Sequence, residues 1–183
     1  MNPREKIVRD YSRWTVLSAL RAGPNHPKSR DVVYPALDAV RFCDLLDLSN
    51  GPITEDEFGR WHQEMVQLLC DVHCNDERAL NVGWASKMLN IYLKTTVYLG
   101  GLGRPRLIDW IHPPIDRGLW RGLRCQFANR NDILGFINAA GGIGEINHYP
   151  TYMTIVKGCR LAAQASNCKL IEVEQYWTAA ESK

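Results

Sequence analysis

Apolar residues recur along this chain at helical spacing, and no segment alternates apolar and polar residues as a half-buried strand does. The densest apolar run extends from Trp84 to Leu99 and covers more than one helical face. We therefore expect a central helix there, buried on most sides. Its polar exceptions are three or four residues apart and form one stripe, which we expect to face away from the core: Lys87, Asn90 and Lys94.

The same spacing, together with capping and stop signals, predicts the other helices. Asn2 and Pro3 begin the first one, and Thr54 with Glu57 forms a capping box. Further helices are predicted at about 35–48, 54–73, 131–138, 150–165 and 169–180.

The composition fits one globular protein. Its 183 residues are 45% hydrophobic, which is enough to bury a substantial core. We expect an all-α fold with two helical lobes around a cleft, as one domain over 1–183 with candidate sub-lobes 1–80 and 81–183. No run reaches the roughly 18 apolar residues of a membrane span, and the charged start is unlike a signal peptide. We therefore expect a cytoplasmic monomer that does not contact a membrane.

A break follows the central helix and leads to a lone carboxylate. Pro113 and Pro114 fix an extended approach to the next helix, with Asp116 in its first turn or as its cap. The net charge is only +2, but residues 84–130 carry eight Lys or Arg against two Asp or Glu. These cations could neutralise DNA phosphates or form a solvated surface. The basic residues concerned are Lys87, Lys94, Arg104, Arg106, Arg117, Arg121, Arg124 and Arg130.

The sequence VGWASK at the helix start, followed by the break and by PIDR, resembles the helix-hairpin-helix DNA glycosylase superfamily. The nearest members are the bacterial 8-oxoguanine DNA glycosylase-like proteins, and the segment 149–177 resembles their closing helices more weakly. The resemblance implies that Val82 and Gly83 belong to a hairpin that grips a DNA phosphate through backbone N–H groups. It also implies that Asp116 is the catalytic carboxylate.

Two positions depart from the family pattern. Asn81 stands where the hairpin usually has its first glycine. Ala85 occupies the position of the nucleophilic lysine of bifunctional members, and Lys87, two residues further on, is rotated by roughly 200° around the helix. We therefore expect a monofunctional enzyme and keep Lys87 as a candidate second catalytic residue.

One carboxylate suffices for this chemistry, because breaking an N-glycosidic bond builds positive charge on the sugar that a carboxylate stabilises. The base must first leave the stack, and aromatic walls favour its binding. The candidate walls are Trp84, Tyr92 and Trp120, although a tryptophan more often belongs to the core. We expect excision of a damaged or modified base from double-stranded DNA, which leaves an abasic site. Divergence from the family motivates the hypothesis of defence against phages with modified bases.

The sequence gives less support for a metal site or a nucleotide-binding turn. Three soft ligands lie close together without a second pair, so we expect no metal and no cofactor: Cys70, His73 and Cys74. The glycine-rich segment 139–145 follows no strand and is read as a loop, and His26 with Lys28 lies in another. Two alternatives stay open: a non-catalytic DNA-binding module of the same fold, and a helical interaction protein in which Asp116 is only a cap.

Overall fold

The computed structural model describes residues 2–21, 30–72 and 80–179, and its regular elements there are all helical. This confirms the all-α prediction for the described part of the chain. The α-helices are α1 (Pro3–Arg21), α2 (Arg30–Ala39), α3 (Cys43–Leu46), α4 (Glu55–Val72), α5 (Val82–Leu93), α6 (Leu107–Trp110), α7 (Arg117–Gln126), α8 (Asn131–Ile137) and α9 (Tyr149–Ala165). Short 3₁₀ segments are η1 (Leu48–Asn50), η3 (Ile143–Glu145) and η4 (Leu170–Tyr176), and η2 (Lys94–Leu99) is a π-helical segment.

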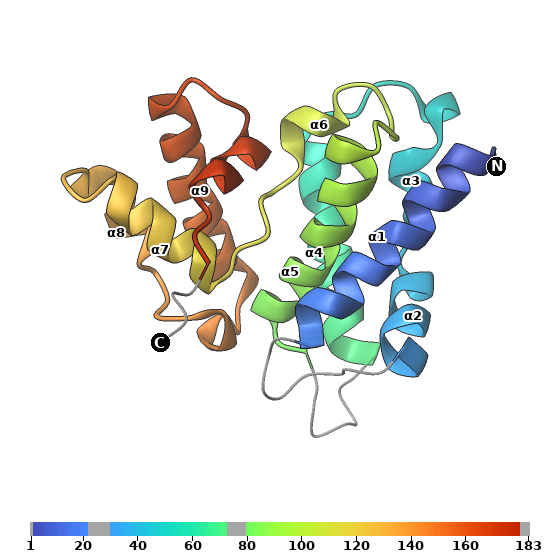
Figure 1. Ribbon diagram of the computed structural model, residues 1–183, viewed down its shortest axis with the longest axis horizontal. Coiled ribbons are helices and arrows are strands. Elements are labelled where there is room, and N and C mark those ends of the chain that lie inside the picture. The colour runs from blue at the N-terminus through green and yellow to red at the C-terminus, as the bar shows by residue number, and fades with distance from the viewer. Residues whose placement is uncertain (1, 22–29, 73–79, 180–183) are drawn as a thin grey trace.

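The helices form two groups (Figure 1). The N-terminal group contains α1 to α6, with α5 packed against α1 and α4. The C-terminal group contains α7, α8, α9 and η4, with α8 packed against α9. The linking segment 111–116 passes between the two groups. A boundary at residue 80 would therefore separate α5 from its main packing partners, so the division lies after α6.

Helix α5 is the centre of the fold. The side chain of Asn81 caps it, since Oδ1 accepts the backbone N–H of Trp84 at 3.0 Å. Every residue from Val82 to Leu93 is buried. The chain then continues as η2 until Gly100, whose N–H donates to the carbonyl oxygen of Thr95. The prediction of a central helix buried on most sides is thus confirmed.

The polar stripe on α5 does not face away from the core, so that prediction is wrong. Lys87 is 8% exposed and Asn90 is fully buried. Asn90 Nδ2 donates to the Pro113 carbonyl oxygen at 3.2 Å and to the Tyr152 hydroxyl at 2.9 Å. The segment 111–116 and α9 therefore cover this face, and helical periodicity alone does not reveal such a covering element.

Asn90 belongs to a buried polar cluster that joins the two groups. His62 of α4 lies 3.0 Å from Asn90 Oδ1 through Nε2 and 2.9 Å from the Tyr149 hydroxyl through Nδ1. His112 Nδ1 lies 2.9 Å from the Tyr152 hydroxyl. Burial lowers the pKa of His62 to about 4 and holds the pKa of His112 well below its usual value. Both rings are therefore neutral at pH 7.

Local signals placed several elements correctly. The capping box of α4 is confirmed, since Glu57 N–H donates to Thr54 Oγ1 at 3.2 Å and Thr54 N–H donates to Glu57 Oε2 at 2.9 Å. The single helix predicted over 35–48 is wrong, because α2 includes Pro35 and ends at Ala39, before α3. A proline removes one helical N–H but need not begin the helix.

The two terminal helices also differ from expectation. In α1 the apolar positions Ile7, Tyr11 and Trp14 are exposed, while the core contacts come from Val16, Leu17 and Leu20. The last helix, predicted over 169–180, is the shorter 3₁₀ segment η4, after which Trp177 has extended backbone. These differences matter for function, because Tyr11 and Trp177 border the site described below.

Some expectations fall on residues outside the described ranges, namely His26, Lys28, His73 and Cys74. Within 2–21, 30–72 and 80–179, no group of His, Cys, Asp and Glu side chains is arranged to hold a metal ion. Across the same ranges, no helix has the length and hydrophobicity that a bilayer crossing requires.

Candidate active site

Asp116 is held by the start of α7. The residue has extended backbone (φ −147°, ψ 179°), and Oδ1 accepts the backbone N–H groups of Gly118 at 2.9 Å and Leu119 at 3.1 Å. The two prolines before it favour this extended approach, and an aspartate is well suited to cap the exposed N–H groups of a helix. The predicted cap is thus confirmed, and it fixes one oxygen of the carboxylate.

The second oxygen of Asp116 faces a lysine. Lys87 Nζ lies 3.4 Å from Asp116 Oδ2, and the two side chains are only 10% and 23% exposed. The ammonium also lies 5.1 Å from the ring centroid of Trp84, within cation–π range. Two sequence-predicted catalytic residues from distant segments therefore meet. Lys87 reaches Asp116 even though it is rotated away from the position of Ala85.

A second ion pair lies on the same face of the central helix. Lys94 Nζ lies 2.9 Å from Glu174 Oε2 and 3.1 Å from Oε1, and both side chains are largely buried. Burial raises the pKa of Glu174, while the charge of Lys94 opposes this rise. The predicted DNA contact Lys94 is thus engaged by an internal carboxylate. Sequence reasoning did not single out Glu174, because only the docking of η4 brings it here.

The two ion pairs border one cavity of about 530 Å³ between the two groups of helices. Helix α1 provides the wall that includes Tyr11 and Thr15, and Trp177 and Pro114 lie on the side of the C-terminal group. Ile91 of α5 lies between the two lysines in the sequence and adds an apolar surface. The cavity therefore combines aromatic walls with paired charges, as small-molecule sites often do.

The aromatic residues predicted for the base pocket lie elsewhere. Tyr92 is buried and stacks on Phe42 with ring centroids 3.9 Å apart, and the indole N–H of Trp120 donates to the Ile137 carbonyl oxygen at 2.9 Å. Trp84 is buried on α5 beneath Lys87 and does not line the cavity. None of the three therefore lines the cavity at Asp116, because the buried faces of α5 and α7 take up these rings.

The start of α5 differs from the predicted phosphate-gripping hairpin. Gly83 N–H donates to the Ile146 carbonyl oxygen at 2.9 Å, so it is already satisfied within the protein. Asn81 has φ −78°, and its Nδ2 donates to the Gly144 carbonyl oxygen at 2.8 Å. This N–H therefore has a partner in place of the predicted phosphate, because the segment around η3 packs where a ligand would approach. Val82 is 8% exposed and lines a separate groove.

The predicted DNA-binding arginines have different environments. Arg104 donates to the carbonyl oxygens of Gly51 at 2.8 Å and Pro52 at 3.1 Å, so its guanidinium is engaged within the protein and braces the loop before α4. Arg121 donates to the Ala179 carbonyl oxygen at 2.9 Å. Arg106 and Arg117 are exposed.

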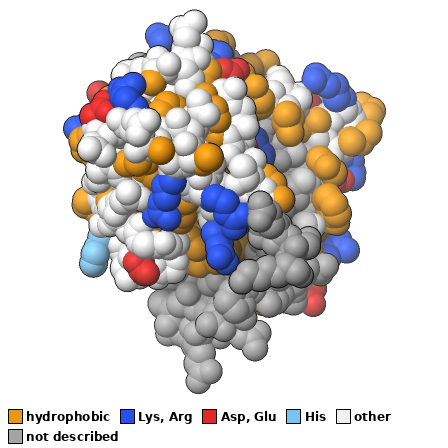
Figure 2. All heavy atoms as spheres, turned by 60° about the vertical axis from the view of Figure 1, so that its left-hand side comes forward, with side chains coloured by type: hydrophobic (Ala, Val, Ile, Leu, Met, Phe, Trp, Pro, Cys, Tyr) orange, Lys and Arg blue, Asp and Glu red, His pale blue; other side chains and the backbone are white. Residues whose placement is uncertain are grey.

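Several basic side chains lie together on one face of the protein (Figure 2). Figure 2, with the C-terminal group turned forward, shows Lys and Arg side chains gathered near the centre of the face among hydrophobic and neutral ones. Among the described arginines, Arg117 directly follows Asp116 in the chain and extends into solvent. It is therefore the exposed cation that is closest in sequence to the carboxylate.

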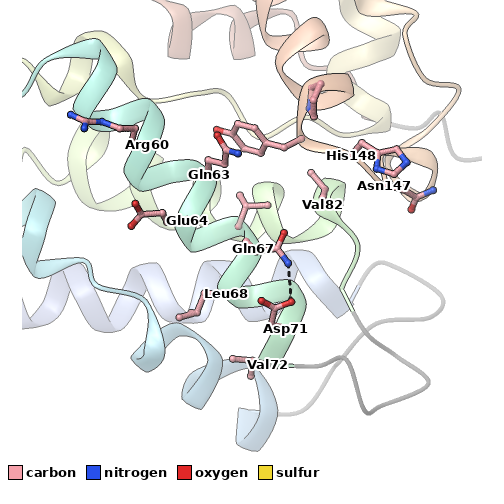
Figure 3. Close-up of a pocket in the computed structure, with 13 residues that line it drawn as sticks. Arg60, Gln63, Glu64, Gln67, Leu68, Asp71, Val72, Val82, Asn147 and His148 are labelled. Atoms are coloured by element: carbon pink, nitrogen blue, oxygen red, sulfur yellow. Dashed lines mark hydrogen bonds between the residues drawn. The ribbon is translucent and has the colours of Figure 1, made fainter.

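A larger groove of about 960 Å³ lies on another side of the molecule (Figure 3). Side chains of α4, including Glu64 and Asp71, line it together with His148 of the segment before α9. Gln67 Nε2 donates to Asp71 Oδ1 at 2.8 Å, so this carboxylate is paired within its own helix. Among the described residues that line this groove, none forms a buried ion pair like those of the cavity at Asp116, which is therefore the better candidate active site.

Comparison with known proteins adds no relative. No family model matches the chain, and neither does any curated protein or solved structure. The geometry around Asp116 is therefore the basis for assigning a function.

Proposed function

We propose that this protein is a DNA glycosylase with a helix-hairpin-helix glycosylase-like fold. It would hydrolyse the N-glycosidic bond of a damaged or modified base flipped out of double-stranded DNA and leave an abasic site. The observation that carries the proposal is the Asp116 carboxylate, held through Oδ1 by the start of α7 and facing Lys87 through Oδ2 in a cavity between two groups of helices.

The geometry suits the demands of this reaction. When the bond between C1′ and the base breaks, its electron pair leaves with the base and the sugar becomes positively charged. A fixed carboxylate stabilises that charge and orients the water that attacks C1′. Lys87 balances the charge of Asp116 before the substrate binds and can stabilise negative charge on the departing base. Only one carboxylate is needed, unlike in most hydrolases of O-glycosides.

The cavity also has a suitable size and lining. Its volume of about 530 Å³ lies within the range of roughly 300–1,000 Å³ that small-molecule sites occupy. Tyr11 and Trp177 offer aromatic surfaces against which a flipped base could stack. Outside the cavity, Arg117 is exposed and available to phosphates. Arg106 is also exposed, and its Nε lies 3.7 Å from Asp109 Oδ2, a contact that a phosphate would replace. We propose that the protein binds DNA as a monomer.

Incubation of the purified protein with a panel of DNA tests this proposal. The panel contains 8-oxoguanine, uracil and alkylated duplexes, together with hydroxymethylated and glucosylated phage genomes. Abasic sites are counted with an aldehyde-reactive probe. Abasic sites on one substrate support the proposal, and abasic sites on modified phage DNA alone support a role in phage defence. Salt-sensitive binding without abasic sites would instead indicate a DNA-binding module, and no binding at low salt would indicate an interaction protein.

One observation favours a second candidate function, strand cleavage after base removal. Lys87 Nζ lies within 3.4 Å of Asp116, where an amine could reach C1′ of the same nucleotide. A lysine that attacks C1′ forms an imine with the opened sugar, and elimination of the 3′ phosphate follows. Hydrolysis by water alone gives no such intermediate, so the two functions can be distinguished.

A further inference from the structure

The chain at the end of η4 packs closely against α7. Residues 176–179, here called the C-terminal strap, lie over the first turns of that helix. Thr178 N–H donates to the Gly118 carbonyl oxygen at 3.3 Å, and Arg121 Nη1 donates to the Ala179 carbonyl oxygen at 2.9 Å. The strap is therefore attached to α7 through its own backbone.

Two glycines one helical turn apart make this approach feasible. A Cβ at Gly122 would overlap the Tyr176 carbonyl oxygen, and a Cβ at Gly118 would overlap the indole of Trp177. Neither glycine has positive φ, so a backbone turn does not require them. Glycine inside a helix costs roughly 1 kcal/mol relative to alanine, which the contact with the strap offsets. By contrast, a Cβ at Gly135 in α8 would have no neighbour within 4 Å.

The strap brings a hydrogen-bond donor to the candidate catalytic carboxylate. Trp177 Nε1 donates to Asp116 Oδ1 at 3.0 Å, in addition to the two backbone N–H groups of α7. Trp177 is 47% exposed, so burial in the core does not hold its ring in place. With Oδ1 occupied by three donors, Oδ2 is the oxygen that faces Lys87.

We propose that Trp177 is a positioning residue for Asp116, and that the strap over Gly118 and Gly122 holds it in place. The inference rests on the proposed function, because it explains how the catalytic carboxylate keeps its orientation. The hydrogen bond from Trp177 restricts rotation of the Asp116 side chain, so that Oδ2 faces C1′ of the flipped nucleotide. A side chain that only packed at the cavity edge would not need its N–H.

Matched pairs of variants test the role of Trp177. Trp177→Phe removes the N–H and keeps an aromatic ring, and Trp110→Phe is its control, since Trp110 Nε1 donates to the Ile53 carbonyl oxygen at 3.1 Å away from the cavity. On the substrate found with the panel, Trp177→Phe should lower kcat roughly tenfold, as loss of one hydrogen bond to a charged group implies, with little change in KM. Trp110→Phe should keep kcat. Equal kcat in both variants would overturn the inference.

Gly122→Ala tests the strap itself, with Gly135→Ala as its control. In the wild-type protein, the indole N–H of Trp177, assigned by its absence in Trp177→Phe, should exchange slowly with solvent despite the exposed ring. Gly122→Ala should speed this exchange and lower kcat, and Gly135→Ala should do neither. Fast exchange in the wild-type protein would overturn the inference.

Crystal structures of Trp177→Phe and Trp110→Phe provide a readout that does not depend on activity. We expect the Asp116 carboxylate to rotate and its contact with Lys87 to lengthen only in Trp177→Phe. An unchanged carboxylate would overturn the positioning role even if the protein excises a base. A rotated carboxylate in a protein that excises no base would support the positioning role and contradict the proposed function.

Discussion

Lys87 Nζ lies 3.4 Å from Asp116 Oδ2, with both side chains mostly removed from solvent. The lysine comes from the most deeply buried helix, and the aspartate caps a helix of the other group. This pair therefore joins the two groups of helices at the cavity between them. The predictions below separate its contributions to stability and to chemistry.

Removal of the Lys87 charge should affect both the stability of the fold and base excision. Lys87→Met keeps most of the unbranched side chain but leaves Asp116 largely buried without its cation. We expect a loss of roughly 1–3 kcal/mol in the free energy of unfolding. This loss is smaller than for a fully buried ion pair, because Asp116 keeps some contact with solvent. Base excision should be strongly reduced. Lys6→Met is the control, since Lys6 forms an exposed pair with Asp10. Urea unfolding that shows equal losses in the two variants would contradict a special role for the Lys87 pair.

Borohydride reduction distinguishes hydrolysis from strand cleavage. Hydrolysis by water predicts that no protein becomes covalently attached to DNA when the reaction is run with sodium borohydride, because no imine forms. A trapped adduct that disappears in Lys87→Met would instead establish Lys87 as the nucleophile. It would also refute the monofunctional assignment.

The buried histidines predict a pH-dependent stability. His62 has a pKa near 6.5 when unfolded and about 4 in the fold, where burial opposes its charged form. Between pH 4 and pH 6.5, the unfolded chain therefore binds a proton at His62 that the folded protein does not bind. This contribution to stability is complete above pH 6.5 and is lost as the pH falls toward 4, by roughly 3 kcal/mol in total. Urea unfolding at several pH values should show this loss, and His62→Gln should reduce it. A slope that is unchanged in the variant would contradict the assignment.

Two arginines should separate structural from DNA-binding roles. Arg104→Gln should lower the free energy of unfolding by roughly 1–3 kcal/mol, because several carbonyl oxygens lose a charged donor. The folded variant should bind DNA as the wild-type protein does. Arg117→Gln should keep the stability and reduce the salt dependence of DNA binding by about one unit of slope. Fluorescence anisotropy across salt concentrations measures that slope. An identical slope in Arg117→Gln and the wild-type protein would exclude Arg117 from the DNA contact.

Local signals in the sequence predicted what depends on local structure. The capping box of Thr54 with Glu57 and the cap of Asp116 follow from residue type and spacing, since a helix start needs acceptors for its free N–H groups. The burial of α5 follows from its apolar faces. Asp116 and Lys87 were identified as candidates from the resemblance and from residue type.

Long-range packing determined what the sequence did not indicate. The stripe with Lys87 and Asn90 has the spacing of a solvated face, and only the docking of other elements buries it. Glu174 reaches the cavity through the docking of η4, and Trp177 reaches it because the strap crosses α7 at Gly118 and Gly122. Helical glycines carry no local signal of such an approach. For the same reason, Tyr92 and Trp120 belong to the core although their residue types suit a base pocket.

The most direct test of the account compares Asp116→Asn with Asp47→Asn on the DNA substrate that the panel identifies. Asparagine caps a helix about as well as aspartate, so Asp116→Asn should keep the fold while it removes the negative charge and its ion pair with Lys87. Asp47 caps η1 through the Ser49 N–H at 2.9 Å and lies outside the cavity, so Asp47→Asn controls for the loss of a capping charge. Abasic sites should form with the wild-type protein and Asp47→Asn, and should fall at least a hundredfold with Asp116→Asn, as loss of a principal charge-stabilising group implies. Equal numbers of abasic sites with all three proteins would contradict the catalytic role of Asp116.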